Sequence, residues 1–384
     1  MKKILIVSGT RADYGIYKPV AENLLQDNWD VSFVVSGMHL SHKYGFTKEL
    51  ILADGFRISG EVQSLFLENN KGNMARSVAL EINGFTNIFE QTSPDFVLLL
   101  GDRGEMLAAA IACLYLGIKT AHIHGGEVSG TVDESIRHAI TKIASVHFAA
   151  TEKSKERLIK MGEDSWRVFP VGAPRIDTIL NNRLPSFRDI KEKYHLKFEK
   201  KKYVLQVFHP VVTELENIEK QILALINSME QQSQPIICIL PNSDAGSEII
   251  RKMYQKYLKT DIIYITNLEP EEYLTILKEC KFMIGNSSSG IIEAASFKIP
   301  VINLGTRQNG REQSKNIINA NLNENENEIE TALNKIQDPQ FIKSLKNVKN
   351  IYGDGNSSRR ITKTLNQILN DGEDIKWIQK QIAY

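Results

Sequence analysis

Short apolar runs alternate with longer amphipathic stretches along most of the chain, which is the pattern of an α/β fold. In the first half, β-branched and apolar runs predict strands over Ile4–Ser8, Val31–Ser36, Phe96–Leu100, Thr120–His124, His147–Thr151 and Val168–Val171. Helical patterns separate some of these runs, for example over Ala75–Gln91 and Gly104–Leu116. Nearly continuous apolar strands of this kind are typical of parallel sheets that helices cover on both faces.

The alternation pauses after Gly172 and then restarts, which predicts a second doubly wound half. The expected strands of this half are Tyr203–Phe208, Pro235–Leu240, Ile262–Thr266, Phe282–Gly285 and Val301–Leu304. We expect an N-terminal domain over 1–175, a C-terminal domain over 176–365 and a terminal helical segment over 366–384, whose packing partner the pattern leaves open. Because open parallel sheets bind ligands at the carboxyl ends of their strands, we expect the ligand in a cleft where those ends of both sheets meet.

Composition narrows the class of protein. A content of 42% hydrophobic and 24% charged residues is typical of soluble globular proteins, and a net charge of +1 argues against a dedicated nucleic-acid or membrane surface. Cys113, Cys238 and Cys280 lie in apolar contexts without metal-binding spacing, which favours core thiols in a reducing compartment. The first apolar run, Ile4–Val7, is too short for a signal peptide or a membrane span. We therefore expect a cytoplasmic protein.

The segment from His122 to His138 carries the densest chemistry, with three histidines, three carboxylates and an arginine. It follows an expected strand, so its side chains should lie at the carboxyl end of the sheet. Asp102, which is either a helix cap or a site residue, follows the strand Phe96–Leu100, and we expect this strand to be the neighbour of the one before the segment. Crowded ionisable groups shift one another's pKa and can divide acid and base roles. This segment predicts an enzyme.

Two loops rich in small residues predict anion binding. Ser8–Gly15 leads into a helix expected to begin near Ile16, but it lacks the GxGxxG spacing; Asp13 is then a cap, or the loop binds an anion with Arg11. Gly285–Glu293 combines glycine, asparagine and serines at the start of a helix, where free amides and hydroxyls can bind a diphosphate. Glu293, expected on the first turn of that helix, can accept hydrogen bonds from ribose hydroxyls.

Taken in order, the motifs of this chain resemble those of the hydrolysing UDP-N-acetylglucosamine 2-epimerases, in particular the sialic-acid-pathway branch. The matching segments run along nearly the whole chain and are Gly9–Tyr14, Gly101–Arg103, His122–His138, Phe208–Val211, Asn242–Ser247, Ile284–Gly290, Asn303–Gln308 and Ile351–Asn356. The resemblance implies the GT-B architecture of two Rossmann-like domains and a reaction without metal or nicotinamide cofactor. It implies elimination of UDP from UDP-N-acetylglucosamine to 2-acetamidoglucal, then hydration to N-acetylmannosamine.

The resemblance also implies roles for single residues. Asp102 and Asp133 match the catalytic acids and Arg137 the arginine beside them. Many members have a catalytic Glu where this chain has His124, so either His124 transfers the proton or Glu127 supplies the carboxylate; we favour Glu127 with His124 assisting. The implied UDP-sugar contacts are Arg11, Arg103, His209, Asn242, Ser287, Ser288, Gly290, Glu293 and Arg307.

Three alternatives stay open from the sequence. The same chemistry could act on UDP-N,N'-diacetylbacillosamine for legionaminic acid, because no motif labels the sugar contacts. A GT-B glycosyltransferase would use the same UDP-binding loops, and a non-catalytic UDP-sugar sensor would bind without turnover. The division of acid and base roles among the carboxylates also stays open. A homo-oligomer, dimer or tetramer, is expected from the resemblance alone.

Overall fold

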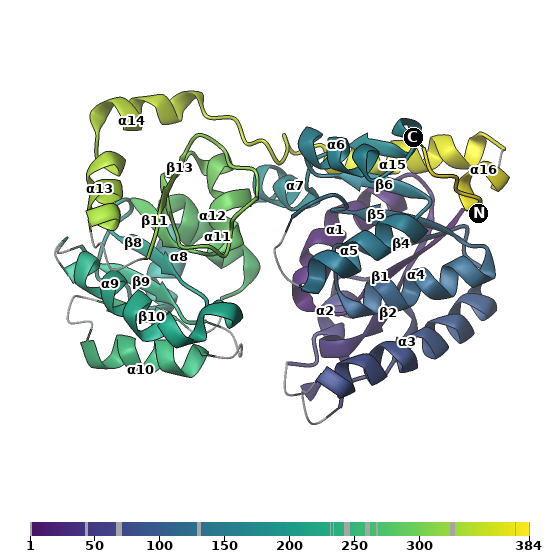
Figure 1. Cartoon of the computed structure of the whole chain (residues 1–384), viewed down its shortest axis with the longest axis horizontal. Helices are drawn as coiled ribbons and strands as arrows, with labels where there is room; N and C mark the ends of the chain where they lie inside the picture. The colour runs from purple at the N-terminus through teal and green to yellow at the C-terminus, as the bar shows by residue number, and fades with distance from the viewer. Residues whose placement is uncertain are drawn as a thin grey trace. The chain divides into compact units, whose positions relative to one another are not determined.

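The structure, a computed structural model, describes residues 2–42, 45–66, 71–128, 132–230, 232, 234–241, 246–257, 262–265, 268–322, 327–372 and 374–383. The chain forms two compact units (Figure 1). Unit 1 comprises Met1–Leu180 and Tyr352–Tyr384, and unit 2 comprises Asn181–Ile351. Each unit is a parallel sheet flanked by helices, as the alternating pattern predicts.

Unit 1 has a seven-stranded sheet in the order β3-β2-β1-β4-β5-β6-β7. Its strands are β1 (Lys3–Ser8), β2 (Asp30–Ser36), β3 (Arg57–Val62), β4 (Phe96–Leu100), β5 (Lys119–Ile123), β6 (Val146–Ala149) and β7 (Val168–Pro170). Its helices are α1 (Arg11–Gln26), α2 (Lys48–Ala53), α3 (Lys71–Thr92), α4 (Gly104–Leu116), α5 (Val132–Ile143), α6 (Glu152–Lys160), α7 (Pro174–Asn181), α15 (Ser357–Asn370) and α16 (Asp374–Ile378). The strand order reverses between β1 and β4, and ligands of such sheets bind at that point.

Unit 2 repeats this topology with six strands in the order β10-β9-β8-β11-β12-β13. They are β8 (Val204–Val207), β9 (Ile236–Ile239), β10 (Ile262–Ile265), β11 (Phe282–Gly285), β12 (Val301–Leu304) and β13 (Ile317–Ala320). The helices are α8 (Phe187–Lys193), α9 (Ile218–Glu230), α10 (Ser247–Tyr257), α11 (Pro270–Glu279), α12 (Ser288–Ile292), α13 (Asn327–Ile336) and α14 (Pro339–Ser344). Here the strand order reverses between β8 and β11.

Strands β3 and β13, which the apolar pattern does not predict, lie at the edges of their sheets. β3 has the sequence RISGEV and leaves most of its side chains partly or fully exposed, so it lacks a continuous apolar run. β13 is the four-residue segment IINA. Edge strands need little apolar surface, because only one side of the strand is covered by a neighbour.

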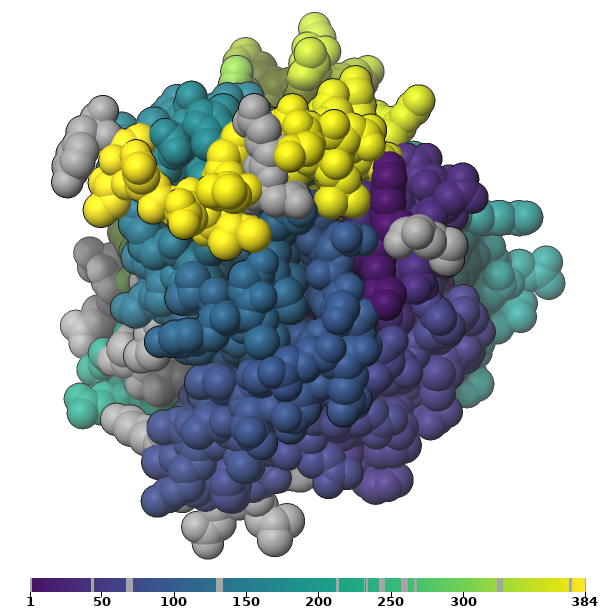
Figure 2. Space-filling view, turned by 90° about the vertical axis from the view of Figure 1, so that its right-hand side faces the viewer, coloured from purple at the N-terminus to yellow at the C-terminus, as the bar shows by residue number. Residues whose placement is uncertain are grey.

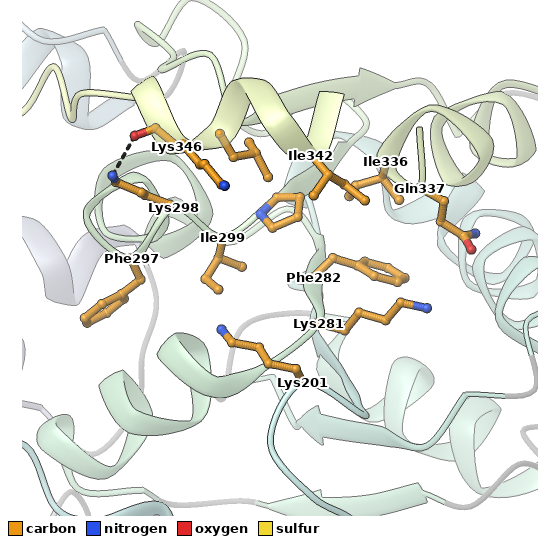
Figure 3. A pocket seen from close by; sticks show the side chains of 12 residues that line it. Lys201, Lys281, Phe282, Phe297, Lys298, Ile299, Ile336, Gln337, Ile342 and Lys346 are labelled. Atoms are coloured by element: carbon orange, nitrogen blue, oxygen red, sulfur yellow. Dashed lines mark hydrogen bonds between the residues drawn. The ribbon is translucent and has the colours of Figure 1, made fainter. Parts of the chain in front are cut away.

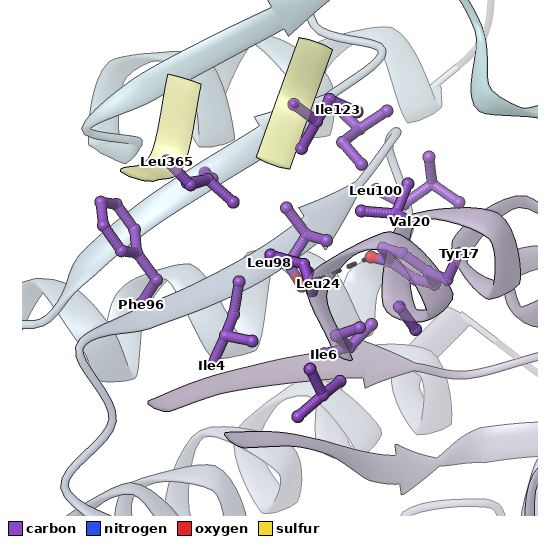
Figure 4. Close-up of a cluster of buried hydrophobic side chains, with 14 of the residues drawn as sticks. Ile4, Ile6, Tyr17, Val20, Leu24, Phe96, Leu98, Leu100, Ile123 and Leu365 are labelled. Atoms are coloured by element: carbon purple, nitrogen blue, oxygen red, sulfur yellow. Dashed lines mark hydrogen bonds between the residues drawn. The ribbon is translucent and has the colours of Figure 1, made fainter. Parts of the chain in front are cut away.

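The C-terminal helix α15 packs into the core of unit 1. Leu365 joins the buried cluster around Ile4, Leu98 and Ile123 (Figure 4), and Figure 2 shows the C-terminal residues, in yellow, along one edge of this unit. Lys2 and Trp29 also donate hydrogen bonds to Asn366 of α15, at 2.7 and 3.0 Å. The unit boundaries at 180 and 351 therefore differ from the domain limits expected at 175 and 365.

The first turn of α15 is capped from elsewhere in unit 1. Asp177 of α7 is buried, and its two carboxylate oxygens accept the amides of Ser357 at 2.9 Å and Ser358 at 2.6 Å. These amides have no partner within their own helix, so the carboxylate satisfies them and opposes the positive end of the helix dipole. The Asp177 side chain thus binds the start of α15, in the C-terminal segment of unit 1, to α7.

Replacing Asp177 by Ala should destabilise unit 1 by about 2 kcal/mol, because two amides lose a charged cap. The three tryptophans, Trp29, Trp166 and Trp377, all belong to unit 1, so tryptophan fluorescence during urea denaturation reports that unit alone. The exposed Glu156 of α6 offers a control, and Glu156→Ala should leave the midpoint unchanged. Equal midpoints for both variants would contradict the capping role.

Candidate active site

Hydrogen bonds join the turns that follow β4 and β5 in unit 1. The register pairs Leu100 with Ile123, which confirms that the strand before Asp102 is the neighbour of the strand before His124. The buried ring of His122 donates from Nε2 to the Gly101 carbonyl, 2.7 Å away. Burial lowers the pKa of His122 to about 3, so its ring is neutral and keeps this single donor role near neutral pH. The backbone that carries Asp102 is thereby fixed against β5.

Arg137 of α5 connects the same two turns through its side chain. It is only 3% exposed, and its guanidinium donates to the Asp102 carboxylate and, at 2.9 Å, to the Glu127 carbonyl. A buried cation of this kind needs such partners, because burial removes its hydration. The structure thus brings together Asp102, Glu127 and Arg137, three of the residues that the sequence proposes as catalytic.

His124 and Glu127 form a direct pair. Nδ1 of His124 lies 2.5 Å from Oε1 of Glu127, and both side chains are largely buried. His124 has a left-handed φ of 65°, which is unusual for a residue with a Cβ, and its amide donates to the Phe148 carbonyl of β6 at 3.1 Å. The two alternatives for the missing family Glu are therefore in contact and can act as one proton-transfer unit.

The loop after β1 contains a buried carboxyl group, that of Asp13. The helix α1 begins at Arg11, earlier than predicted, because Thr10 caps it and Asp13 completes a capping box. Burial raises the pKa of Asp13 to about 6, although the nearby Arg103 opposes this shift. Asp13 is thus a structural cap, as one interpretation of the sequence holds, and also a carboxyl group that titrates close to neutral pH.

Two further buried carboxyl groups lie near this loop, and sequence reasoning missed both. Glu105, at the start of α4, binds Arg103 at 2.8 Å and fills the space that a Cβ on Gly9 would need. Burial, together with the charge of Glu105, raises the pKa of Glu81 to about 7. The sequence gives a signal for Glu105 only, because this residue follows the Gly101-Asp102-Arg103 motif within one helical turn. Arg103 itself occupies the N-cap position of α4, so Asp102 is not the cap.

In unit 2, Asn286 ties the loop after β8 to the loop after β11. Its side chain accepts the His209 amide at 2.7 Å and donates to the His209 carbonyl at 2.8 Å. Arg307 and Gln308 in turn donate to the Asn286 carbonyl, at 3.1 and 2.8 Å. Burial and the charge of Arg307 lower the pKa of His209 to about 4, so this ring is neutral near neutral pH. Asn286 is a positioning residue that the sequence motif contains but does not single out.

The serine loop caps the short helix α12. Ser287 is its N-cap and lies 2.9 Å from Ser289 Oγ, and Ser288 is its first residue. A Cβ on Gly290 would lie 3.0 Å from Val301 of β12, so this glycine lets the helix approach the sheet. The expected position of Glu293 on the first turn is wrong, because α12 ends before it and Glu293 is the C-cap.

Two of the predicted site residues cannot be placed. Asn242, and the side chain of Asp133 on α5, lie outside the residues that the structure describes. Arg11 is the first residue of α1.

Within the described ranges, no group of three or more His, Cys, Asp or Glu side chains could hold a metal ion, and no helix is long and apolar enough to cross a membrane.

Comparison with known proteins identifies the family. Residues 22–366 match the family profile described as UDP-N-acetylglucosamine 2-epimerase. The chain belongs to this family. It is 44% identical over 378 residues, 96% of this chain and 98% of the relative, to a Legionella pneumophila protein named UDP-N,N'-diacetylbacillosamine 2-epimerase (hydrolyzing). It is 36% identical over 83% of both chains to a UDP-N-acetylglucosamine 2-epimerase of Neisseria meningitidis serogroup B.

Solved structures support the fold assignment. The chain resembles the crystal structure of UDP-GlcNAc 2-epimerase from Neisseria meningitidis bound to UDP-GlcNAc, with a TM-score of 0.80. The two share 19% identity, and the match covers 95% of this chain and 100% of the other. The fold is the GT-B fold, with two Rossmann-like units, and the chain is an enzyme of the epimerase family.

The buried histidines of unit 1 should make its stability depend on pH. Burial lowers the pKa of His122 to about 3 and of His147 to about 4, from an ordinary value of 6.5. As the pH falls from about 6.5 toward about 4, the unfolded chain takes up protons that the folded unit excludes, so stability decreases. Each histidine adds up to about 1.4 kcal/mol per pH unit to this slope.

The variant His122→Asn should therefore show a smaller loss of unfolding free energy between about pH 6 and about pH 5 than the parent chain. Urea denaturation followed by tryptophan fluorescence at each pH measures both slopes. Identical slopes for the two proteins would show that His122 is protonated in the folded unit.

Proposed function

We propose that this enzyme is a hydrolysing 2-epimerase that acts on a UDP-sugar with a 2-acetamido group. The observation that carries the proposal is the linked set of Asp102, Arg137, Glu127 and His124, at the carboxyl ends of neighbouring strands in a family of UDP-sugar epimerases. Carboxylates and a histidine in one buried network supply the groups that acid–base chemistry at a carbon atom requires.

The reaction is an elimination followed by a hydration. A base removes the proton from C2 while the C1–O bond breaks, so that UDP leaves with the bonding electrons and a C1–C2 double bond forms. Water then adds its oxygen to C1, and a proton reaches C2 from the opposite face. The products are UDP and the free 2-epimeric sugar. General acid–base assistance of this kind contributes typically about 10²- to 10⁴-fold in rate.

Within unit 1, we propose that Asp102 and the His124–Glu127 pair serve as the acid and base. Arg137 keeps Asp102 close to the Glu127 backbone and lowers the cost of holding a charged carboxylate there. The His124–Glu127 contact allows a proton to pass between the two side chains, so that the pair can accept a proton from the substrate and return it. Asp133, matched from the family motif, is proposed as a further acid on α5.

For unit 2, we propose binding of the UDP part through His209, Ser287, Ser288 and Arg307. Neutral His209 supplies a hydrogen bond to the diphosphate, whereas Arg307 supplies positive charge. Stabilising the charge that develops on the leaving diphosphate is usually the largest single contribution to such catalysis. We also propose Arg11, Arg103, Asn242, Gly290 and Glu293 as UDP-sugar contacts, from the family motifs that they match.

As the sugar we propose UDP-N,N'-diacetylbacillosamine, since the relative with 44% identity over 96% of this chain carries that substrate in its name. UDP-N-acetylglucosamine, the substrate that the motifs first suggest, is the second candidate and is supported by the relative with 36% identity. The two sugars differ at C4 and C6, so both undergo the same chemistry at C1 and C2.

The enzyme should release UDP from both sugars, with a kcat/KM at least about tenfold higher for UDP-N,N'-diacetylbacillosamine. In D2O the free sugar should carry one deuterium at C2, which mass spectrometry and proton NMR both detect. A preference for UDP-N-acetylglucosamine would select the second candidate. Product without deuterium at C2 would contradict the epimerase mechanism, and UDP-sugar binding without any turnover would indicate a sensor.

Removing the proposed acid–base groups should reduce turnover and spare nucleotide binding. Asp102→Asn keeps the size of the side chain but loses its charge, so kcat should fall by at least about 100-fold while the Kd for UDP stays within about threefold. Glu127→Gln should cost a similar factor, and His124→Gln about tenfold. Because the two side chains act as a pair, the double variant should be no slower than Glu127→Gln alone.

The matched control is Asp189→Asn, which makes the same change at an exposed position on α8. UDP release gives kcat, and calorimetry gives the Kd. Near-normal turnover in Asp102→Asn would overturn its assignment, and inactivity of His124→Gln beside an active Glu127→Gln would transfer the proton-transfer role to the histidine.

A further inference from the structure

Unit 2 contains a pocket at the amino ends of β11 and β12, whereas His209 and Ser287 follow the carboxyl ends of β8 and β11. Phe282, the first residue of β11, and Pro300, which directly precedes β12, lie in its lining (Figure 3). The pocket has a volume of about 500 Å³. Binding sites for small molecules typically have this size. It is thus separate, within this unit, from the groups proposed to bind UDP.

The walls of the pocket are largely apolar. Phe282 and Ile299 are buried beneath it, and Ile342 of α14 leaves 50% of its surface exposed. Leu345, in the 3-10 helix that follows α14, contributes a further aliphatic side chain. An apolar hollow of this size that stays open to solvent favours an apolar ligand body.

Four lysines surround these apolar walls: Lys201, Lys281, Lys298 and Lys346. Among the described residues that line the pocket, none is Asp or Glu. In Figure 3 the ammonium groups of Lys201 and Lys346 point toward the middle of the pocket from opposite sides. Lys298 donates to the Lys346 carbonyl at 2.6 Å, and Lys201 donates to the Lys278 carbonyl. Carbonyls accept these protons without cancelling the charge. The Glu279 carboxylate, which acts on Lys201 from outside the lining, pairs with Lys200 at 3.6 Å, so the four lysines give the lining a net positive charge.

The backbone at two of these lysines supports a role for their side chains. Lys201 has a φ of 61° and Lys298 a φ of 56°, in the left-handed region that glycine and asparagine adopt most easily. A lysine at such a position is less favourable than glycine. Both unfavourable lysines line the same pocket, which is consistent with selection for their charge.

We propose that this pocket binds a small anionic amphiphile, a molecule with a carboxylate, phosphate or sulfonate group on an apolar body. The apolar body would pack between Ile299 and Ile342, and the anion would bind Lys201 and Lys346. The proposal does not depend on the reaction that the enzyme catalyses.

The test uses two fluorescent probes with the same aromatic body, 1-anilinonaphthalene-8-sulfonate and the uncharged N-phenyl-1-naphthylamine. The test variant is Lys201→Asn with Lys346→Gln, since asparagine tolerates the left-handed φ at 201. The control is Lys202→Asn with Lys343→Gln, which removes the same charge from neighbouring exposed lysines outside the pocket. Lys346→Gln alone is a second test variant that leaves residue 201 unchanged.

Removing two cationic partners should weaken sulfonate binding by at least about tenfold in the double test variant and severalfold in Lys346→Gln. The control should match the parent within about twofold, binding of the uncharged probe should change little, and saturating UDP should not displace the sulfonate. Equal losses in the test and control variants, equal affinity for the two probes, or displacement of the sulfonate by UDP would overturn the proposal.

Discussion

A buried guanidinium, that of Arg137, connects the two turns of unit 1 that carry the proposed acid–base groups. Its partners lie on two different turns: the carboxylate of Asp102 after β4 and the carbonyl of Glu127 after β5. A shift of either turn would leave a desolvated charge with fewer partners, which is costly inside a protein. The planar guanidinium also directs its donors at fixed angles. The spacing between Asp102 and the His124–Glu127 pair therefore depends on Arg137 of α5 together with the His122–Gly101 hydrogen bond.

In unit 2, a neutral side chain connects two loops in the way that Arg137 connects two turns in unit 1. The Asn286 amide bridges the loop after β8 to the loop after β11, as Arg137 bridges two turns in unit 1. Because a primary amide carries no charge, this bridge does not compete with the cation of Arg307 for an anion. In unit 2 the bridge lies where the strand order reverses, between β8 and β11. In unit 1 it joins the turns after β4 and β5, one strand away from the reversal between β1 and β4.

The buried strands and the order of the motifs could be predicted from the sequence, because both depend on local periodicity and spacing. Buried strands such as Phe96–Leu100 form nearly as expected, and the neighbouring positions of Asp102 and the His122 segment follow from parallel pairing. Features that depend on tertiary contacts were not accessible. The edge strands β3 and β13 have too little apolar character, and the packing of α15 on unit 1 requires partners as far as 364 residues away. The carboxyl groups of Glu81 and Glu105 become notable only through burial, which a single sequence does not encode locally.

The order of the segments along the chain means that the two units are completed at different times during synthesis. Unit 2 is one continuous segment, Asn181–Ile351, whereas unit 1 consists of the segments on either side of it. A ribosome therefore synthesises every residue of unit 2 before it makes α15. Until α15 arrives, the apolar surface that Leu365 covers around Ile4 and Leu98 is open to water. Unit 1 therefore completes its core only after the segment of unit 2 has been made, and until then the nascent chain exposes apolar surface.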